Sequence, residues 1–130
     1  MKSLLSLFLI LIFFSSCFRA PERNCSDFKT GVFEFVAITD SDTLISIFER
    51  HEDYEIDRFQ NQVDTSSVRW INDCEMILRN KNPKNNQEKE AIHIKILETN
   101  VNGYRFEYGY LSEPIKMRGY AKKIRSLEKS

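Results

Sequence analysis

Residues 91–108 read AIHIKILETNVNGYRFEY, and this stretch decides the fold. Apolar and polar side chains alternate before and after Asn102-Gly103, a dipeptide that strongly favours a tight turn between antiparallel strands. We therefore predict a β-hairpin. The side chains that alternate with polar ones are Ile92, Ile94 and Ile96 on the first strand and Tyr104, Phe106 and Tyr108 on the second.

Outward from this hairpin, the same period of two recurs along the chain, with turn residues about every ten positions. It predicts strands over residues 31–36, 44–50, 54–59, 68–71, 74–78, 91–97, 104–108 and 115–124. We expect a polar loop after Phe59, a tight turn at Asn72-Asp73, and a long surface loop, a candidate lid, over Asn80–Glu90.

Sequential hairpins of about eight strands can close into an up-and-down barrel, which removes the exposed edges of an open sheet. The expected fold class is therefore all-β, an antiparallel meander closed as a calycin-like barrel. A two-sheet β-sandwich is the alternative, because periodicity does not separate the two forms. Lipocalin-type barrels are an architectural analogy that rests on Gly31-Val32-Phe33, which opens the first strand.

The N-terminus resembles a bacterial lipoprotein signal. One lysine precedes a largely apolar run over residues 4–14, which is too short for a permanent membrane helix. Small serines then precede Cys17, although Phe14 stands where such signals usually carry leucine. We expect residues 1–16 to be a cleaved signal peptide and Cys17 to carry the lipid. An ordinary secretory peptide and an uncleaved anchor are the alternatives.

This signal predicts an exported protein anchored by its lipid, at the outer membrane and facing the periplasm. Residues 17–24 would form a lipidated tether that reaches at most ~25 Å. Residues 25–130 would form a single domain. Without Cys17 an even pair of cysteines remains, Cys25 and Cys74, and an oxidising compartment favours a disulfide between them. Buried free thiols or half of a metal site are the alternatives.

Charge and motifs restrict the function. The chain carries 19 basic and 19 acidic residues, so no global field attracts nucleic acid. His51-Glu52-Asp53 is typical of a hairpin turn, because adjacent residues rarely converge on one ion. His93 stands alone, and Ser66-Ser67 has no partnered histidine. We therefore expect no catalytic residue, no metal, no cofactor and no enzymatic activity.

Three segments carry a closer resemblance: PERNC at residues 21–25, DFKTG at 27–31 and SVRWINDCE at 67–75. They look like a family of small envelope lipoproteins from the Bacteroidota, and the resemblance implies no activity. Members of that family often carry the label DNA topoisomerase IV. A topoisomerase needs a DNA-gate domain with a nucleophilic tyrosine and an acidic metal cluster, which one small, neutral, exported domain cannot accommodate. We regard that label as an error.

Two features are candidates for function. An aromatic set could pack the core or line a ligand cavity, with tyrosine hydroxyls as polar contacts; it comprises Phe33, Phe35, Trp70, Tyr104, Phe106 and Tyr108. We expect Trp70 to be a buried core residue. A basic face on the last strand could lie on anionic headgroups or simply protect a strand edge; it comprises Lys116, Arg118 and Lys122.

Three hypotheses of function follow: a membrane-tethered module that binds a small apolar ligand, an interaction protein of the cell envelope, and an unrecognised enzyme. An open cavity would favour the first. A large exposed apolar patch would favour the second, and a cleft with converging titratable groups the third.

Overall fold

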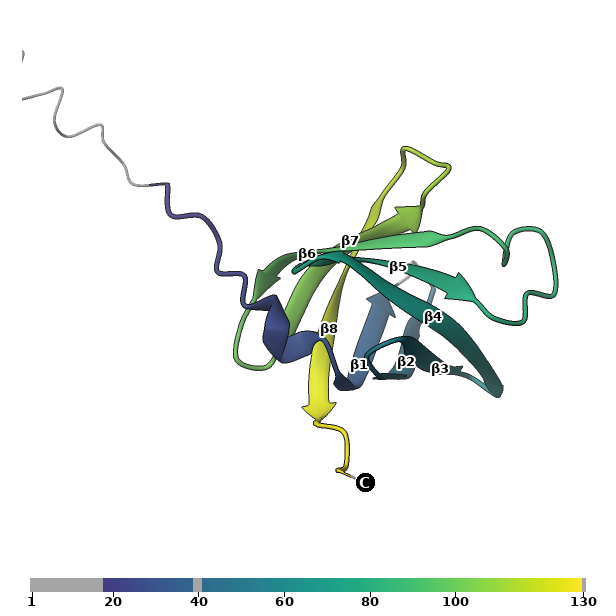
Figure 1. The fold of residues 1–130 in the computed structure, drawn as a ribbon, viewed down its shortest axis with the longest axis horizontal. Helices are drawn as coiled ribbons and strands as arrows, with labels where there is room; N and C mark the ends of the chain where they lie inside the picture. Colours follow the sequence, from purple (N-terminus) through teal and green to yellow (C-terminus); the bar gives the residue numbers. More distant parts are fainter. Residues whose placement is uncertain (1–17, 39–40, 130) are drawn as a thin grey trace, which may run out of the picture.

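The structure is a computed structural model that describes residues 18–38 and 41–129. Within these residues, eight antiparallel strands follow one another in chain order around a closed barrel (Figure 1). The barrel closes because β8 pairs with β1. A short 3-10 helix precedes the strands, and the elements are η1 (Cys25–Phe28), β1 (Gly31–Ile38), β2 (Thr43–Arg50), β3 (Tyr54–Phe59), β4 (Gln62–Asn72), β5 (Glu75–Asn80), β6 (Ile92–Thr99), β7 (Gly103–Tyr110) and β8 (Met117–Arg125). The predicted up-and-down barrel is confirmed, in place of the sandwich.

The prediction of a polar loop after Phe59 is wrong, because β4 already begins at Gln62. Residues 62–67 are mostly polar, so hydrophobic periodicity gives no signal there. They form a strand because each pairs with a residue of β3, from Phe59 opposite Gln62 to Tyr54 opposite Ser67. Pairing with a neighbouring strand thus overrides local composition.

Aromatic and aliphatic side chains fill the half of the barrel next to η1. Phe33, Met76 and Ile96 are fully buried there. The ring of Phe33 stacks on Phe48 with 5.1 Å between centroids and meets Tyr104 edge-on at 5.8 Å. This filled half is the hydrophobic core, and η1 covers it by packing Phe28 against Tyr104.

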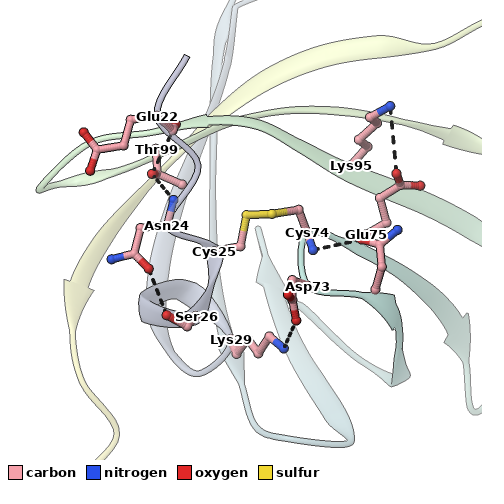
Figure 2. Close-up of a disulfide and its surroundings, with 11 residues drawn as sticks. Glu22, Asn24, Cys25, Ser26, Lys29, Asp73, Cys74, Glu75, Lys95 and Thr99 are labelled. Atoms are coloured by element: carbon pink, nitrogen blue, oxygen red, sulfur yellow. Dashed lines mark hydrogen bonds and ion pairs between the residues drawn. A yellow bond between two sulfur atoms is a disulfide. The ribbon is translucent and has the colours of Figure 1, made fainter. Parts of the chain in front are cut away.

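A disulfide between Cys25 and Cys74 fastens η1 to the turn between β4 and β5 (Figure 2). The two Cα atoms lie 5.4 Å apart, and the bridge spans 49 residues of sequence. In the chain-entropy model such a loop closure stabilises a fold by roughly 4 kcal/mol. A further contact comes from β8, where Lys123 Nζ donates to the carbonyl of Asp27 at 2.7 Å. The disulfide and this hydrogen bond hold the closed end of the barrel.

Part of the predicted tether is docked on the barrel. The backbone N–H of Thr99 donates to the carbonyl of Glu22, and the N–H of Asn24 donates to Thr99 Oγ1, both at 2.8 Å (Figure 2). Residues 18–21 remain exposed and extend away from the barrel (Figure 1). The predicted signal peptide 1–16 and the predicted lipidation residue Cys17 lie outside the described residues. In the part that is described, the chain forms no helix long and apolar enough to cross a membrane.

Candidate ligand-binding cavity

A cavity of about 460 Å³ occupies the end of the barrel opposite η1. Its lining includes residues near the C-terminal ends of β1 and β3 and near the N-terminal ends of β2 and β4, such as Ala37, Leu44, Phe59 and Gln62. A deeper space of about 180 Å³ shares Phe35 and other lining residues with it. The barrel is therefore filled at one end and hollow at the other.

The loop between β5 and β6 reaches the rim of this cavity. Gln87, Glu88 and Glu90 from this loop line the cavity, so the segment predicted as a lid lies at the mouth. Glu88 stabilises the loop by accepting hydrogen bonds from the backbone N–H of Lys84 at 2.7 Å and from Asn85 Nδ2 at 3.0 Å. Glu90 and Gln87 are exposed to solvent, and the cavity that they line is open rather than enclosed.

One wall of the cavity is apolar and aromatic. Phe35 stands at its centre, with ring centroids 5.5 Å from Phe106 and 6.0 Å from Tyr108, and Ile92 lies in the same lining. The side chain of Phe35 lies directly over Gly119 of β8, where an added Cβ would collide with its ring. Glycine at this position therefore allows the aromatic wall to pack against the backbone of β8.

The other wall carries carboxylates. Asp57 of β3 and Asp64 of β4 are direct partners in the strand pairing, and both line the cavity. Ser46 Oγ donates a hydrogen bond to Asp57 Oδ1 at 2.5 Å. Burial raises the pKa of Asp57 above its ordinary value, the bond from Ser46 opposes this, and the negative charge of Asp64 adds to it. The fold thus places two like charges opposite each other at a half-buried wall.

A buried ion pair lies at the bottom of the deeper space, next to η1. Arg50 Nε donates to Glu55 Oε2 at 2.6 Å, and Arg50 Nη1 donates to Tyr104 Oη at 3.1 Å. The guanidinium also lies 5.3 Å from the ring centroid of Phe33 and 5.0 Å from that of Phe48, within the range of cation–π attraction.

These neighbours determine the charge of Arg50. Burial acts to lower its pKa, but Glu55 and Tyr104 outweigh burial and raise the pKa above the ordinary value, so the guanidinium stays charged. This ion pair leaves no recognisable signal in the sequence. Arg50 lies on the same face of β2 as Phe48, and Glu55 lies on the same face of β3 as Asp57. A charged residue that points into the barrel can be recognised only once its partner strand is known.

The predicted aromatic set divides between the two halves of the barrel. Phe33 lies in the core of the filled half, and Phe35 and Tyr108 line the hollow half, whereas Tyr104 and Phe106 are core residues that also line its deeper space. Trp70 is half-buried rather than fully buried, and it packs against the closed-end core with Lys29 Nζ 5.2 Å from its ring centroid. Its Nε1 is buried without a hydrogen-bond partner among the described residues.

The predicted basic face extends along β8 from the cavity rim toward the closed end. Lys116 Nζ donates to the carbonyl of Tyr110 at 2.8 Å, and Arg118 lies 3.7 Å from Glu107. Lys122 is the direct strand partner of Glu34. Contact of this face with a membrane stays a prediction, and each of its charges already has a polar or acidic neighbour in the barrel.

The two histidines lie outside the cavity lining. His51 Nε2 is 2.8 Å from Glu49 Oε1, and His93 Nε2 is 2.9 Å from Glu75 Oε2. Over residues 18–38 and 41–129, no group of three or more histidine, cysteine, aspartate or glutamate side chains is arranged to hold a metal ion. Comparisons with protein families, curated proteins and solved structures find no match for this chain.

Proposed function

We propose that this protein is a membrane-tethered binding protein that holds a small amphipathic ligand in the hollow half of its barrel. The observation that carries the proposal is the open cavity of about 460 Å³. Ligand sites are clefts or cavities of about 300–1,000 Å³ with mainly apolar walls and a few placed polar groups. The Phe35 wall and the Asp57–Asp64 wall supply these two kinds of surface.

The docked tether supports a defined orientation of the cavity. If Cys17 carries a lipid, the free chain from Cys17 to Glu22 spans at most about 17 Å. The tether leaves the barrel beside η1, on the side away from the β5–β6 loop (Figure 1). The closed end would then face the membrane, and the mouth of the cavity would face away from it, accessible to solutes.

Binding of a neutral amphipathic probe, 1-naphthalenemethanol, tests this function. The full chain in phosphatidylcholine nanodiscs should bind the probe saturably in isothermal titration, after subtraction of empty nanodiscs. Ile92→Trp and Ser66→Trp place a large ring in the cavity from β6 and β4, and each should abolish binding. Val101→Trp, on a turn residue that is 96% exposed at the closed end, is the matched control and should bind normally.

The result that overturns the proposal is equally specific. If the wild type does not bind the probe, or if both cavity-filling variants fold and bind it as the wild type does, the hollow half is not a ligand site. The hypothesis of an interaction protein of the envelope would then lead.

A further inference from the structure

Most of the charged side chains that line the cavity are acidic. Its lining includes the carboxylates of Glu55, Asp57, Asp64, Glu88 and Glu90, and among the described residues it includes no lysine. The one arginine that reaches the deeper space is Arg50, which is already paired with Glu55. Arg50 thus neutralises Glu55, and the excess negative charge of the lining comes from Asp57, Asp64, Glu88 and Glu90.

The pairing of Asp57 with Asp64 lowers the stability of the barrel, and the fold does not require carboxylates at these positions. Like charges directly opposite each other on neighbouring strands are destabilising. On β4, Ser66 faces the same cavity two residues from Asp64 and carries no charge. Two aspartates at the partnered positions are explained most simply by a positive charge that occupies the space in front of them.

Glu55 provides a separate indication at the bottom of the cavity. Its side chain is only 8% exposed, and it lines both the wide and the deep part of the lumen. Its Oε2 accepts from Arg50, while Oε1 has no hydrogen-bond partner among the described residues. A carboxylate oxygen of a mostly buried side chain that lines a cavity and lacks a donor is suited to accept a hydrogen bond from a ligand.

The opposite wall determines what kind of cation fits. Phe35, Tyr108 and Ile92 offer apolar surface and ring faces, which attract organic cations and apolar groups. A bare metal ion would make no use of this wall. A neutral sugar would desolvate the carboxylates without compensating their charge.

We propose that the ligand is an organic ammonium ion, with its charged nitrogen between Asp57 and Asp64 and its apolar body against Phe35 and Ile92. This inference rests on the proposed ligand-binding function and specifies the chemistry of the ligand.

Three probes of matched shape test the charge preference. The full chain in phosphatidylcholine nanodiscs is titrated with 1-naphthylmethylammonium, with neutral 1-naphthalenemethanol and with 1-naphthoate. The cation should bind at least about tenfold tighter than the neutral probe, and the anion should bind more weakly than either. Added sodium chloride should weaken binding of the cation and leave the neutral probe unchanged.

Substitutions of single carboxylates and of the pair test which side chains attract the cation. Asp57→Asn/Asp64→Asn should remove the preference for the cation while the neutral probe still binds, which also shows that the cavity remains folded. Glu52→Gln removes an exposed carboxylate in the β2–β3 turn, at the other end of the barrel, and should leave the preference intact. Asp64→Asn alone should reduce the preference, with the hydrogen bond from Ser46 to Asp57 preserved.

Each of the remaining results of these titrations leads to a single conclusion. Equal affinity for the cation and the neutral probe overturns the inference and leaves the proposed function standing, whereas no binding of any probe overturns both. A cation preference that survives in the double variant places the charge elsewhere and overturns the assignment to Asp57 and Asp64. Displacement of the ammonium probe by calcium chloride well beyond the effect of sodium chloride at equal ionic strength would identify a metal site instead.

Discussion

Arg50 and Glu55 are direct partners across β2 and β3, and their side chains join at 2.6 Å beneath the cavity with only 1% and 8% of their surfaces exposed. A buried ion pair is weak evidence for stability, because desolvation of two charges offsets their attraction. Its position suggests another role. The pair lines the deeper space next to η1, where Arg50 Nη1 donates to the carbonyl of Phe28 at 3.4 Å, and it holds a carboxylate at the bottom of the proposed ligand site.

Removal of one partner of this ion pair should be far more harmful than removal of both. Arg50→Met leaves Glu55 buried without its cation, and we expect the free energy of unfolding to fall by about 3–5 kcal/mol. Arg50→Met/Glu55→Leu should recover much of that loss. Urea unfolding followed by circular dichroism measures both. A single variant within about 1 kcal/mol of the wild type would contradict the buried pairing.

Asp57→Asn should stabilise the protein at neutral pH. Burial and the charge of Asp64 raise the folded-state pKa of Asp57, so the wild type loses stability as the pH rises through that pKa. Asparagine avoids this loss, and relief of the like-charge pair is worth about 0.2–1 kcal/mol. The gain should shrink as the pH falls and vanish below the ordinary pKa of 3.8.

Urea unfolding of both proteins over this pH range checks the prediction, with Glu52→Gln as the exposed control. A difference between Asp57→Asn and the wild type that does not change with pH would show that Asp57 is not held at an electrostatic cost.

Reduction of the Cys25–Cys74 bridge should loosen the closed end. Cys74→Ser removes a disulfide that spans 49 residues, and we expect a loss of about 2–5 kcal/mol. Thermal unfolding with and without reductant measures it, and the wild type should respond to reductant whereas the variant should not. Thiol titration of the unfolded, unreduced protein should detect no free thiol from this pair; two reactive groups would refute the bridge.

Trp70→Ala should weaken the fold and leave the cavity intact. Trp70 is half-buried against the closed-end core, so the loss should fall near the lower end of the 3–5 kcal/mol typical of large aromatic residues. Trp70 does not line the cavity, and affinity for 1-naphthalenemethanol should therefore be unchanged in the variant below its unfolding transition. Loss of the probe with full stability would instead make Trp70 part of a binding surface.

Cys17→Ala should abolish acylation and membrane retention, since the lipid is the only membrane anchor that we propose for the mature chain. Metabolic labelling with a fatty-acid analogue, followed by membrane fractionation, checks this. Persistent labelling of the variant would show that the lipoprotein interpretation of the N-terminus is wrong. The expected release of a soluble variant would also provide protein for probe titrations without lipid.

The fold class could be predicted from local patterns, whereas the candidate site could not. Six aromatic residues were predicted as core or cavity lining, and all six belong to the core or pack against it. The carboxylates of Glu55, Asp57 and Asp64 gave no such signal, because an alternating polar residue normally marks the solvent side of a strand. On β3 this pattern is reversed, because the acidic residues face the cavity and not the solvent.

The sequence by itself indicated the period of two, a turn near Asn102-Gly103 and a disulfide between Cys25 and Cys74, because these depend on neighbouring residues or on a simple count. The structure moves the turn to residues 100–102, and Gly103 already begins β7. The tertiary structure decided the strand at residues 62–67, the direction in which Asp57 and Asp64 point, and the hollow half of the barrel. These features depend on closure of the barrel. Pairing of β8 with β1 defines which face of each strand points into the barrel. The volume of the inward-pointing side chains then determines how much space remains inside.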